Sequence, residues 1–221
     1  MVLESQFRHA RRMSRAVAVL ASISALGFAA FGATAPAASA SLLGTVLPSC
    51  SPVPTATPFA AWGDTNSYFL MPGGGFEPGT KAWGLAGASS VNGNETSFVN
   101  GTTNSHSLAM PTGSVAVSPT QCVAMGENTI RLFVKNSGVA SSVLHIDAYV
   151  QSPLTGLVLS TGFDINGTAG ATSWAPTNQL LIPNLLGGVL TTQNLTLVFS
   201  ARGAAATWNI DDVFVDPFKL R

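Results

Sequence analysis

The sequence between residues 59 and 217 is a succession of short apolar runs, each closed by Gly, Pro, Asn or Ser. Runs of about four to eight β-branched, aromatic or aliphatic residues between turn residues are typical of β-strands. They cover residues 68–71, 114–117, 129–135, 143–150, 156–160, 195–200 and 208–215. No stretch keeps the apolar repeat of a helix for several turns, and Pro183 and Gly187 interrupt the one candidate, residues 180–190. The pattern predicts an all-β chain folded as a single sandwich of antiparallel strands.

The charge and hydrophobic content of the chain exclude some classes of protein. The chain has 221 residues, and its ten Lys+Arg balance its ten Asp+Glu, so the formal net charge is zero. Only 9% of the residues are charged, against roughly 25% in a typical soluble domain. Because there is no basic excess to neutralise phosphates, we expect no nucleic-acid partner. The hydrophobic content of 46% excludes the composition of a disordered chain.

Residues 1–40 have the composition of a secretory signal peptide. Four arginines open the segment: Arg8, Arg11, Arg12 and Arg15. An apolar stretch follows at residues 16–33, and the Ala-Ser-Ala sequence at 38–40 supplies the small residues that a signal peptidase recognises. We expect cleavage before Ser41 and a secreted or cell-envelope protein with no further membrane contact. A retained signal anchor is the alternative, since the apolar stretch approaches the length of a membrane span, and the route of export stays open between the general and twin-arginine pathways.

Cys50 and Cys122 are the only cysteines of the chain. Outside the cytoplasm such a pair is expected to form a disulfide, and two free thiols are the alternative. Cys50 belongs to a Pro-rich stretch, so the bridge would fix an extended arm to the folded body. The predicted organisation is a signal peptide at residues 1–40, the arm at 41–58 and the sandwich at 59–218.

The strongest hairpin signal joins residues 131–135 to 144–150 through Asn136, Ser137 and Gly138. Alternation places the apolar side chains of both strands on the core face. The opposite face then carries a polar and aromatic set: Arg131, Phe133, Lys135, His145, Asp147 and Tyr149. Such a set on a sheet face is a candidate ligand-binding patch, and an ordinary solvated face is the alternative.

Two segments of the sequence carry a family resemblance. The segment 74–79 (Gly-Gly-Phe-Glu-Pro-Gly) precedes Trp83, and the segment 208–213 (Trp-Asn-Ile-Asp-Asp-Val) lies near the C-terminus. They resemble the start and end of the jelly-roll, galactose-binding-like modules of secreted cellulases and xylanases. This resemblance covers most of residues 74–216 and implies a jelly-roll β-sandwich that binds an extracellular carbohydrate. The whole chain also resembles a group of uncharacterised secreted proteins of actinobacteria, which share the Cys-bearing arm and the Ser-Pro-x-x-Cys segment at residues 118–122 and imply the fold without an activity.

The jelly-roll resemblance further implies a structural calcium ion where the first and last strands lie side by side. Carried over by motif, Glu77 and either Asp211 or Asp212 would supply carboxylates, and backbone carbonyls would complete the shell. The chemistry is consistent, because Ca²⁺ takes about six to eight oxygen ligands. The alternative is that the two adjacent aspartates lie on opposite faces of their strand.

No constellation in the sequence predicts an enzyme. A nucleophilic hydrolase needs a nucleophile with a base in reach, and no Gly-x-Ser-x-Gly turn is present. Beyond the leader the only histidines are His106 and His145, too few for a histidine-based zinc site. The acids near the C-terminus do not reproduce the carboxylate pair of a glycosidase, so a glycoside hydrolase ranks third among the alternatives.

The four tryptophans after the leader are Trp62, Trp83, Trp174 and Trp208. All lie in motif-like or strand-opening segments, where core packing is the commoner role. We therefore expect a secreted, non-catalytic sandwich that binds a glycan through the predicted hairpin patch. The rival is a structural or partner-binding envelope protein of the same fold without a sugar site, and the sequence predicts no oligomeric state.

Overall fold

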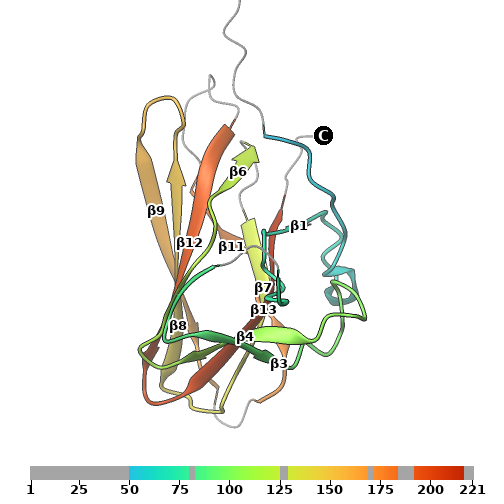
Figure 1. The fold of residues 1–221 in the computed structure, drawn as a ribbon, viewed down its shortest axis with the longest axis vertical. Helices are drawn as coiled ribbons and strands as arrows, with labels where there is room; N and C mark the ends of the chain where they lie inside the picture. The colour runs from blue at the N-terminus through green and yellow to red at the C-terminus, as the bar shows by residue number, and fades with distance from the viewer. Residues whose placement is uncertain (1–49, 80–82, 125–128, 169–171, 184–191, 217–221) are drawn as a thin grey trace, which may run out of the picture. The chain divides into compact units, whose positions relative to one another are not determined.

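The protein folds as a sandwich of two antiparallel β-sheets (Figure 1). The computed structural model describes residues 50–79, 83–124, 129–168, 172–183 and 192–216. These residues belong to one compact unit, Thr45–Arg221. Within the described ranges the only helical element is one 3₁₀ turn, η1 (Ala60–Trp62). The predicted all-β class and jelly-roll type of sandwich are confirmed, while the predicted leader lies outside the described residues.

The first sheet, called here the β7 sheet, has seven strands. They are β1 (Phe69–Leu70), β3 (Ser89–Asn92), β4 (His106–Pro111), β7 (Thr129–Asn136), β10 (Ala175–Pro176), β11 (Leu180–Leu181) and β13 (Thr207–Asp216). The order is β10–β7–β13–β4–β3, with β1 paired to β13 and β11 paired to β7. The β7 and β13 strands therefore form the centre of this sheet.

The second sheet, called the β8 sheet, has six strands. They are β2 (Gly84–Ala86), β5 (Val115–Val117), β6 (Gln121–Ala124), β8 (Ser142–Gln151), β9 (Val158–Asn166) and β12 (Thr192–Gly203). The order is β2–β5–β12–β8–β9, and β6 also pairs with β12. The strands β8, β9 and β12 have 10, 9 and 12 residues, so they are longer than the apolar runs of about four to eight residues on which the prediction rests.

Alternating side chains from both sheets fill the core. In β8 the alternate residues Leu144, Ile146 and Ala148 have no exposed surface, because successive side chains of a strand point to opposite faces. Trp83 packs on Phe199 with ring centroids 5.4 Å apart. Complete burial of such apolar side chains is the main source of the stability of a sandwich.

The predicted hairpin between residues 131–135 and 144–150 is wrong. β7 pairs with β13, whereas β8 pairs with β12 and β9, so these consecutive strands lie in opposite sheets. The backbone N–H of Ser137 donates to the carbonyl of Thr207 (3.0 Å), which continues the pairing of β7 with β13 beyond the strand. The segment after β7 therefore crosses from one sheet to the other instead of closing a hairpin.

The N-terminal arm is attached to the sandwich by a disulfide and by non-covalent contacts. A disulfide joins Cys50 to Cys122 of β6, as predicted. Further along, Ala56 forms an isolated β-bridge with Tyr68, and Phe59 is completely buried. Residues 50–68, called the arm from here on, thus include a segment on the outer face of the β7 sheet, where Phe59 packs against Phe133.

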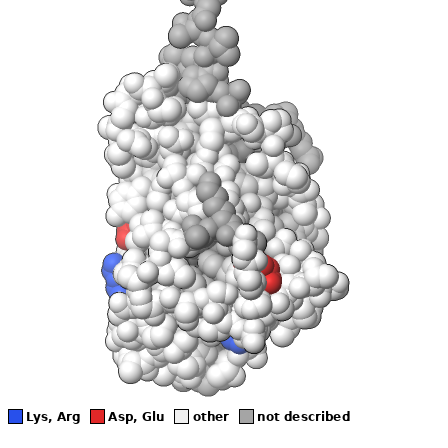
Figure 2. Space-filling view, viewed as in Figure 1, with Lys and Arg blue, Asp and Glu red and all other residues white. Residues whose placement is uncertain are grey.

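Charged side chains are sparse on the face of the molecule shown in Figure 2. This sparseness agrees with the composition, in which 9% of all residues are charged. Nowhere in the described ranges does a helix reach the length and hydrophobicity needed to cross a membrane.

Candidate functional site

The outer face of the β8 sheet carries the first candidate site. Because β8 alternates between core and surface, His145, Asp147 and Tyr149 point outward together. Tyr149 is 39% exposed. Its partners across the strands are small and polar, Thr196 of β12 and Ser160 of β9. An exposed phenol ring therefore stands on a polar surface that spans three adjacent strands.

His145 is held between two carboxylates on this face. Its Nδ1 lies 2.6 Å from Oδ1 of Asp164, and its Nε2 lies 3.1 Å from Oδ1 of Asp147. Hydrogen bonding to Asp164 raises the pKa of His145 and, with the help of Asp147, outweighs the opposing effect of burial. A Cβ at Gly162 would lie 3.1 Å from Cε1 of the ring, so glycine at that position leaves room for the imidazole. The cluster joins three polar side chains by hydrogen bonds and presents carboxylate oxygens to solvent.

A β-bulge in β13 forms the second candidate site. The register of β13 against β7 shifts between Asp211 and Phe214, and Asp212 adopts a φ of 48°, which non-glycine residues rarely do. Bulges of this kind redirect side chains. Here Asp211 and Asp212 both become completely buried, and Glu95 from the loop between β3 and β4 is completely buried as well.

Two of these three acids hold the loop between β3 and β4 in place. Asp211 accepts hydrogen bonds from the backbone N–H groups of Glu95 (2.8 Å) and Asp212 (2.9 Å). Glu95 in turn accepts from the N–H groups of Ser97 and Val99, both at 2.6 Å. Neither carboxylate oxygen of Asp212 has a hydrogen-bond partner among the described residues, although both are buried. Asp212 therefore lacks the compensation that a buried polar group requires.

The electrostatics of the bulge follow from this burial. Burial raises the pKa of Asp211 to about 8, and the charge of Asp212 adds to the effect. Burial also raises the pKa of Asp212 to about 7, with the charge of Glu95 adding to it. The Asn100 side chain acts to lower the pKa of Asp212 and so opposes this rise. Its position does not meet the geometry of a hydrogen bond to either carboxylate oxygen of Asp212. Near neutral pH the two aspartates are thus partly protonated, and a cation would favour their charged forms.

The residues predicted as calcium ligands are only partly brought together. Glu77 accepts hydrogen bonds from the N–H groups of Ser105 (2.6 Å) and His106 (2.9 Å), and its charge contributes to the raised pKa of Asp212. Among the described residues, no group of three or more His, Cys, Asp or Glu side chains is arranged so that it could hold a metal ion. The donor chemistry of Asp212 nevertheless suits a hard cation, because its two buried carboxylate oxygens have no hydrogen bond.

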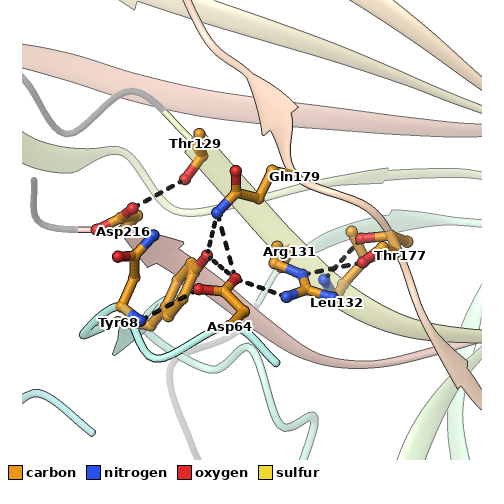
Figure 3. A network of polar contacts seen from close by, with 9 residues as sticks. Asp64, Tyr68, Thr129, Arg131, Leu132, Thr177, Gln179 and Asp216 are labelled. Carbon is orange, nitrogen blue, oxygen red and sulfur yellow. Dashed lines mark hydrogen bonds and ion pairs between the residues drawn. The ribbon is translucent and has the colours of Figure 1, made fainter. Parts of the chain in front are cut away.

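The arm builds a third polar site on the β7 sheet (Figure 3). Oδ2 of Asp64 accepts hydrogen bonds from the Tyr68 hydroxyl (2.6 Å), from Arg131 (2.6 Å) and from the Gln179 amide (3.2 Å). Arg131 also donates through Nε to the carbonyl of Thr177 (2.9 Å). Burial acts to raise the pKa of Asp64, but these hydrogen bonds outweigh it and hold the pKa below its ordinary value. The network fixes the arm to β7 through a largely buried ion pair.

Removing the charge of Asp64 is expected to destabilise the protein. In Asp64→Asn the Arg131 side chain, only 8% exposed, loses its charged partner, which we expect to lower the free energy of unfolding by about 2–4 kcal/mol. Chemical denaturation of the variant and the parent measures the difference. Asp164→Asn is the matched control, because Asp164 is 61% exposed and the same substitution there should cost about 0.5 kcal/mol or less. Equal losses in the two variants would contradict a structural role for the Asp64–Arg131 pair.

The predicted ligand patch is therefore divided between two sides of the sandwich. Arg131 and Phe133 are 7% and 1% exposed beneath the arm, and Lys135 places its Nζ 4.7 Å from the ring centroid of Trp174. The other three residues of the patch lie on the opposite sheet, where His145 and Tyr149 remain at the surface. The expectation of a single patch fails because β7 and β8 do not pair.

The tryptophans also divide into two groups. Trp83 and Trp208 are 7% and 2% exposed and belong to the core, as expected. Trp62 is 41% exposed, and Trp174 is partly buried against the aromatic cluster of Phe59, Tyr68, Phe133 and Phe214. The sequence holds one signal for this difference, since Trp62 precedes Gly63 and Asp64 in a turn-rich segment without apolar alternation.

Comparison with known proteins gives similarity of fold only. The sequence matches no protein-family model and no curated protein. The structure is similar to the module TmCBM61 in complex with β-1,4-galactotriose, at 15% identity over 66% of this chain and 92% of that chain, with a TM-score of 0.35. It is also similar to a family 11 carbohydrate-binding module of a cellulosomal cellulase of Clostridium thermocellum, at 13% identity over 76% of this chain and 97% of that chain, with a TM-score of 0.39. A β-1,3-glucan-binding module from Bacillus halodurans matches at 15% identity over 61% and 89% of the two chains, with a TM-score of 0.39. These values identify neither a family nor a site.

Proposed function

We propose that the protein acts outside the cell and binds a carbohydrate, without catalysis, on the outer face of the β8 sheet. The observation that carries this proposal is the ring of Tyr149, which is 39% exposed on a surface of polar side chains from three strands. A sugar offers one apolar ring face and several hydroxyl groups. An exposed aromatic ring suits the first, and a few fixed polar groups suit the second.

The cluster around His145 supplies such fixed polar groups. Asp164 is 61% exposed and Asp147 is 26% exposed in their side chains, so both carboxylates retain oxygens that can accept hydroxyl hydrogen bonds. Because His145 bridges them, little side-chain freedom remains to be lost when a ligand binds. The surface is therefore preorganised for hydroxyl recognition.

Two features support a non-catalytic role. Both ring nitrogens of His145 already face carboxylates, so this histidine is not placed to activate a nucleophile. A glycosidase also needs an acid with a raised pKa that reaches the substrate. The acids with strongly raised pKa values, Asp211 and Asp212, are completely buried.

Binding is expected to depend on the Tyr149 ring. In affinity gels that contain neutral polysaccharides, at least one polymer should retard the purified protein, and Tyr149→Ala should weaken its affinity by about tenfold, because a central aromatic contact is lost. Tyr149→Phe keeps the ring and should bind nearly as well. Phe98→Ala is the matched control, since Phe98 is an exposed aromatic residue elsewhere (44%). If no neutral polymer retards the protein, or if Tyr149→Ala is retarded like the parent, the β8-sheet site is wrong.

We further propose that the bulge of β13 binds a structural calcium ion. Asp212 would be its principal ligand, with Asp211, Glu77 and the Asn100 side chain as neighbouring donors. The support for this proposal is the pair of Asp212 oxygens that are buried without hydrogen bonds. When bound, the ion would supply the positive charge that keeps these acids ionised.

A further inference from the structure

We propose a second carbohydrate site, specific for acidic sugars, on the outer face of the β7 sheet. Its parts are the exposed ring of Trp62 and the ammonium group of Lys135 beside Trp174. The site lies on the opposite side of the sandwich from Tyr149, and it stands or falls independently of the surface proposed there.

The Trp62 ring is exposed although its surroundings are ordered. It meets Phe133 edge to face, with ring centroids 5.3 Å apart, yet 41% of the residue faces solvent. The segment on either side is anchored, by buried Phe59 before it and by the bond from Arg131 to Asp64 after it. A large aromatic surface held rigidly in water is suited to stacking against a sugar ring, because little conformational entropy is lost on binding.

Lys135 adds a positive charge to this surface. Its Nζ lies over the Trp174 ring, 4.7 Å from the centroid, which is a cation–π contact. No carboxylate of the described residues forms an ion pair with Lys135. Two acids on this side of the sandwich are already engaged, since Asp211 accepts two backbone N–H hydrogen bonds and Asp64 is bound to Arg131. The ammonium group therefore remains available to an anionic ligand.

The two parts of the site lie at neighbouring outward positions of β7. Phe133 and Lys135 are alternate residues of β7, so their side chains share the outer face about 7 Å apart. Trp62 contacts the first of these positions, and Trp174 contacts the second. A short oligosaccharide that stacks one ring on Trp62 can thus bring a carboxylate of the same chain to Lys135. Uronic acids combine these two properties, an apolar ring face and a carboxylate.

Titration calorimetry with oligogalacturonate and with its methyl ester tests the proposal, because esterification keeps the sugar chain and removes the negative charge. The protein should bind the acid form, and the methyl ester at least about tenfold more weakly. Trp62→Ala and Lys135→Met should each weaken binding of the acid form by about tenfold. Lys135→Arg keeps the positive charge and should bind the acid form like the parent. Added salt should reduce the affinity for the acid form, since the contact with Lys135 is electrostatic.

Two controls separate this site from the β8 sheet. Tyr149→Ala should bind oligogalacturonate like the parent, while Trp62→Ala should leave the binding of neutral polysaccharides unchanged. No measurable binding of oligogalacturonate, equal affinity for the acid and its methyl ester, or loss of binding in Tyr149→Ala but not in Trp62→Ala would overturn the proposal. None of these results would affect the test of the neutral-glycan site.

Discussion

In buffer that contains a chelator, the protein should unfold at a lower temperature at about pH 8 than at about pH 5, because the folded state must then ionise Asp211 and Asp212 in a buried site. The pKa values of these groups are raised from 3.8 to about 8 and about 7. Between pH 4 and 8 the folded protein therefore holds protons that the unfolded chain releases, and stability falls as the pH rises. For two coupled groups we expect a loss of roughly 3–5 kcal/mol, or about 10 °C in the unfolding midpoint. Thermal denaturation across this pH range measures it.

Calcium should reverse the loss at high pH. An ion that binds only the folded state at about one hundred times its dissociation constant adds about 2.7 kcal/mol, and its effect should grow as the aspartates ionise. Asp212→Asn should abolish the calcium effect and reduce the pH dependence, whereas Asp147→Asn, on the open face of β8, should leave the calcium effect unchanged. A midpoint that is constant or rises from pH 5 to 8 would contradict the burial of these charges. A midpoint that calcium leaves unchanged at pH 8 would contradict the ion alone.

Replacing Cys50 and Cys122 together by Ser should lower the unfolding midpoint by roughly 10 °C. The disulfide closes a loop with a sequence separation of 72 residues, and a loop of this size restricts the unfolded chain by about 4 kcal/mol. Differential scanning calorimetry of the double variant and the parent measures the shift.

Single replacements provide the control for the disulfide. Cys50→Ser and Cys122→Ser should each cost as much as the double variant, because either one opens the loop. The arm itself should stay in place in all three variants, since the bridge from Ala56 to Tyr68 and the buried Phe59 lie beyond the disulfide. A double variant as stable as the parent would mean that the crosslink contributes nothing to stability.

The class of the fold and the disulfide could be predicted from the sequence because both depend on local signals. The run at β8, for example, alternates apolar and polar residues over nearly its whole length, and only a strand buries such a pattern on one side. Local signals do not show which strand pairs with which. Leu132 in β7 and Leu144 in β8 face the same core, and this is true whether the two strands pair in one sheet or stack across the sandwich. Periodicity therefore cannot distinguish a hairpin from a crossing between sheets.

The candidate sites show the same limit. Tyr149 and His145 were identified because their strand places them outward, which is a local property. Glu95 carries no such signal, because it stands in a loop rich in Asn and Thr. It is completely buried where its backbone N–H reaches Asp211 of a distant strand. Arg131 and Phe133 also follow the strand period, but the arm covers them. Long-range contacts of this kind depend on tertiary structure, and no pattern within the sequence expresses them.

The crossing from β7 to β8 has a consequence for the valency of the molecule. Because the two strands stand in different sheets, their outward side chains are directed to opposite sides of a core about 10 Å thick. A ligand bound over Tyr149 cannot compete for space with one bound over Trp62. A molecule that uses both faces would join two separate polymer chains, as a junction in a network, instead of coating a single chain.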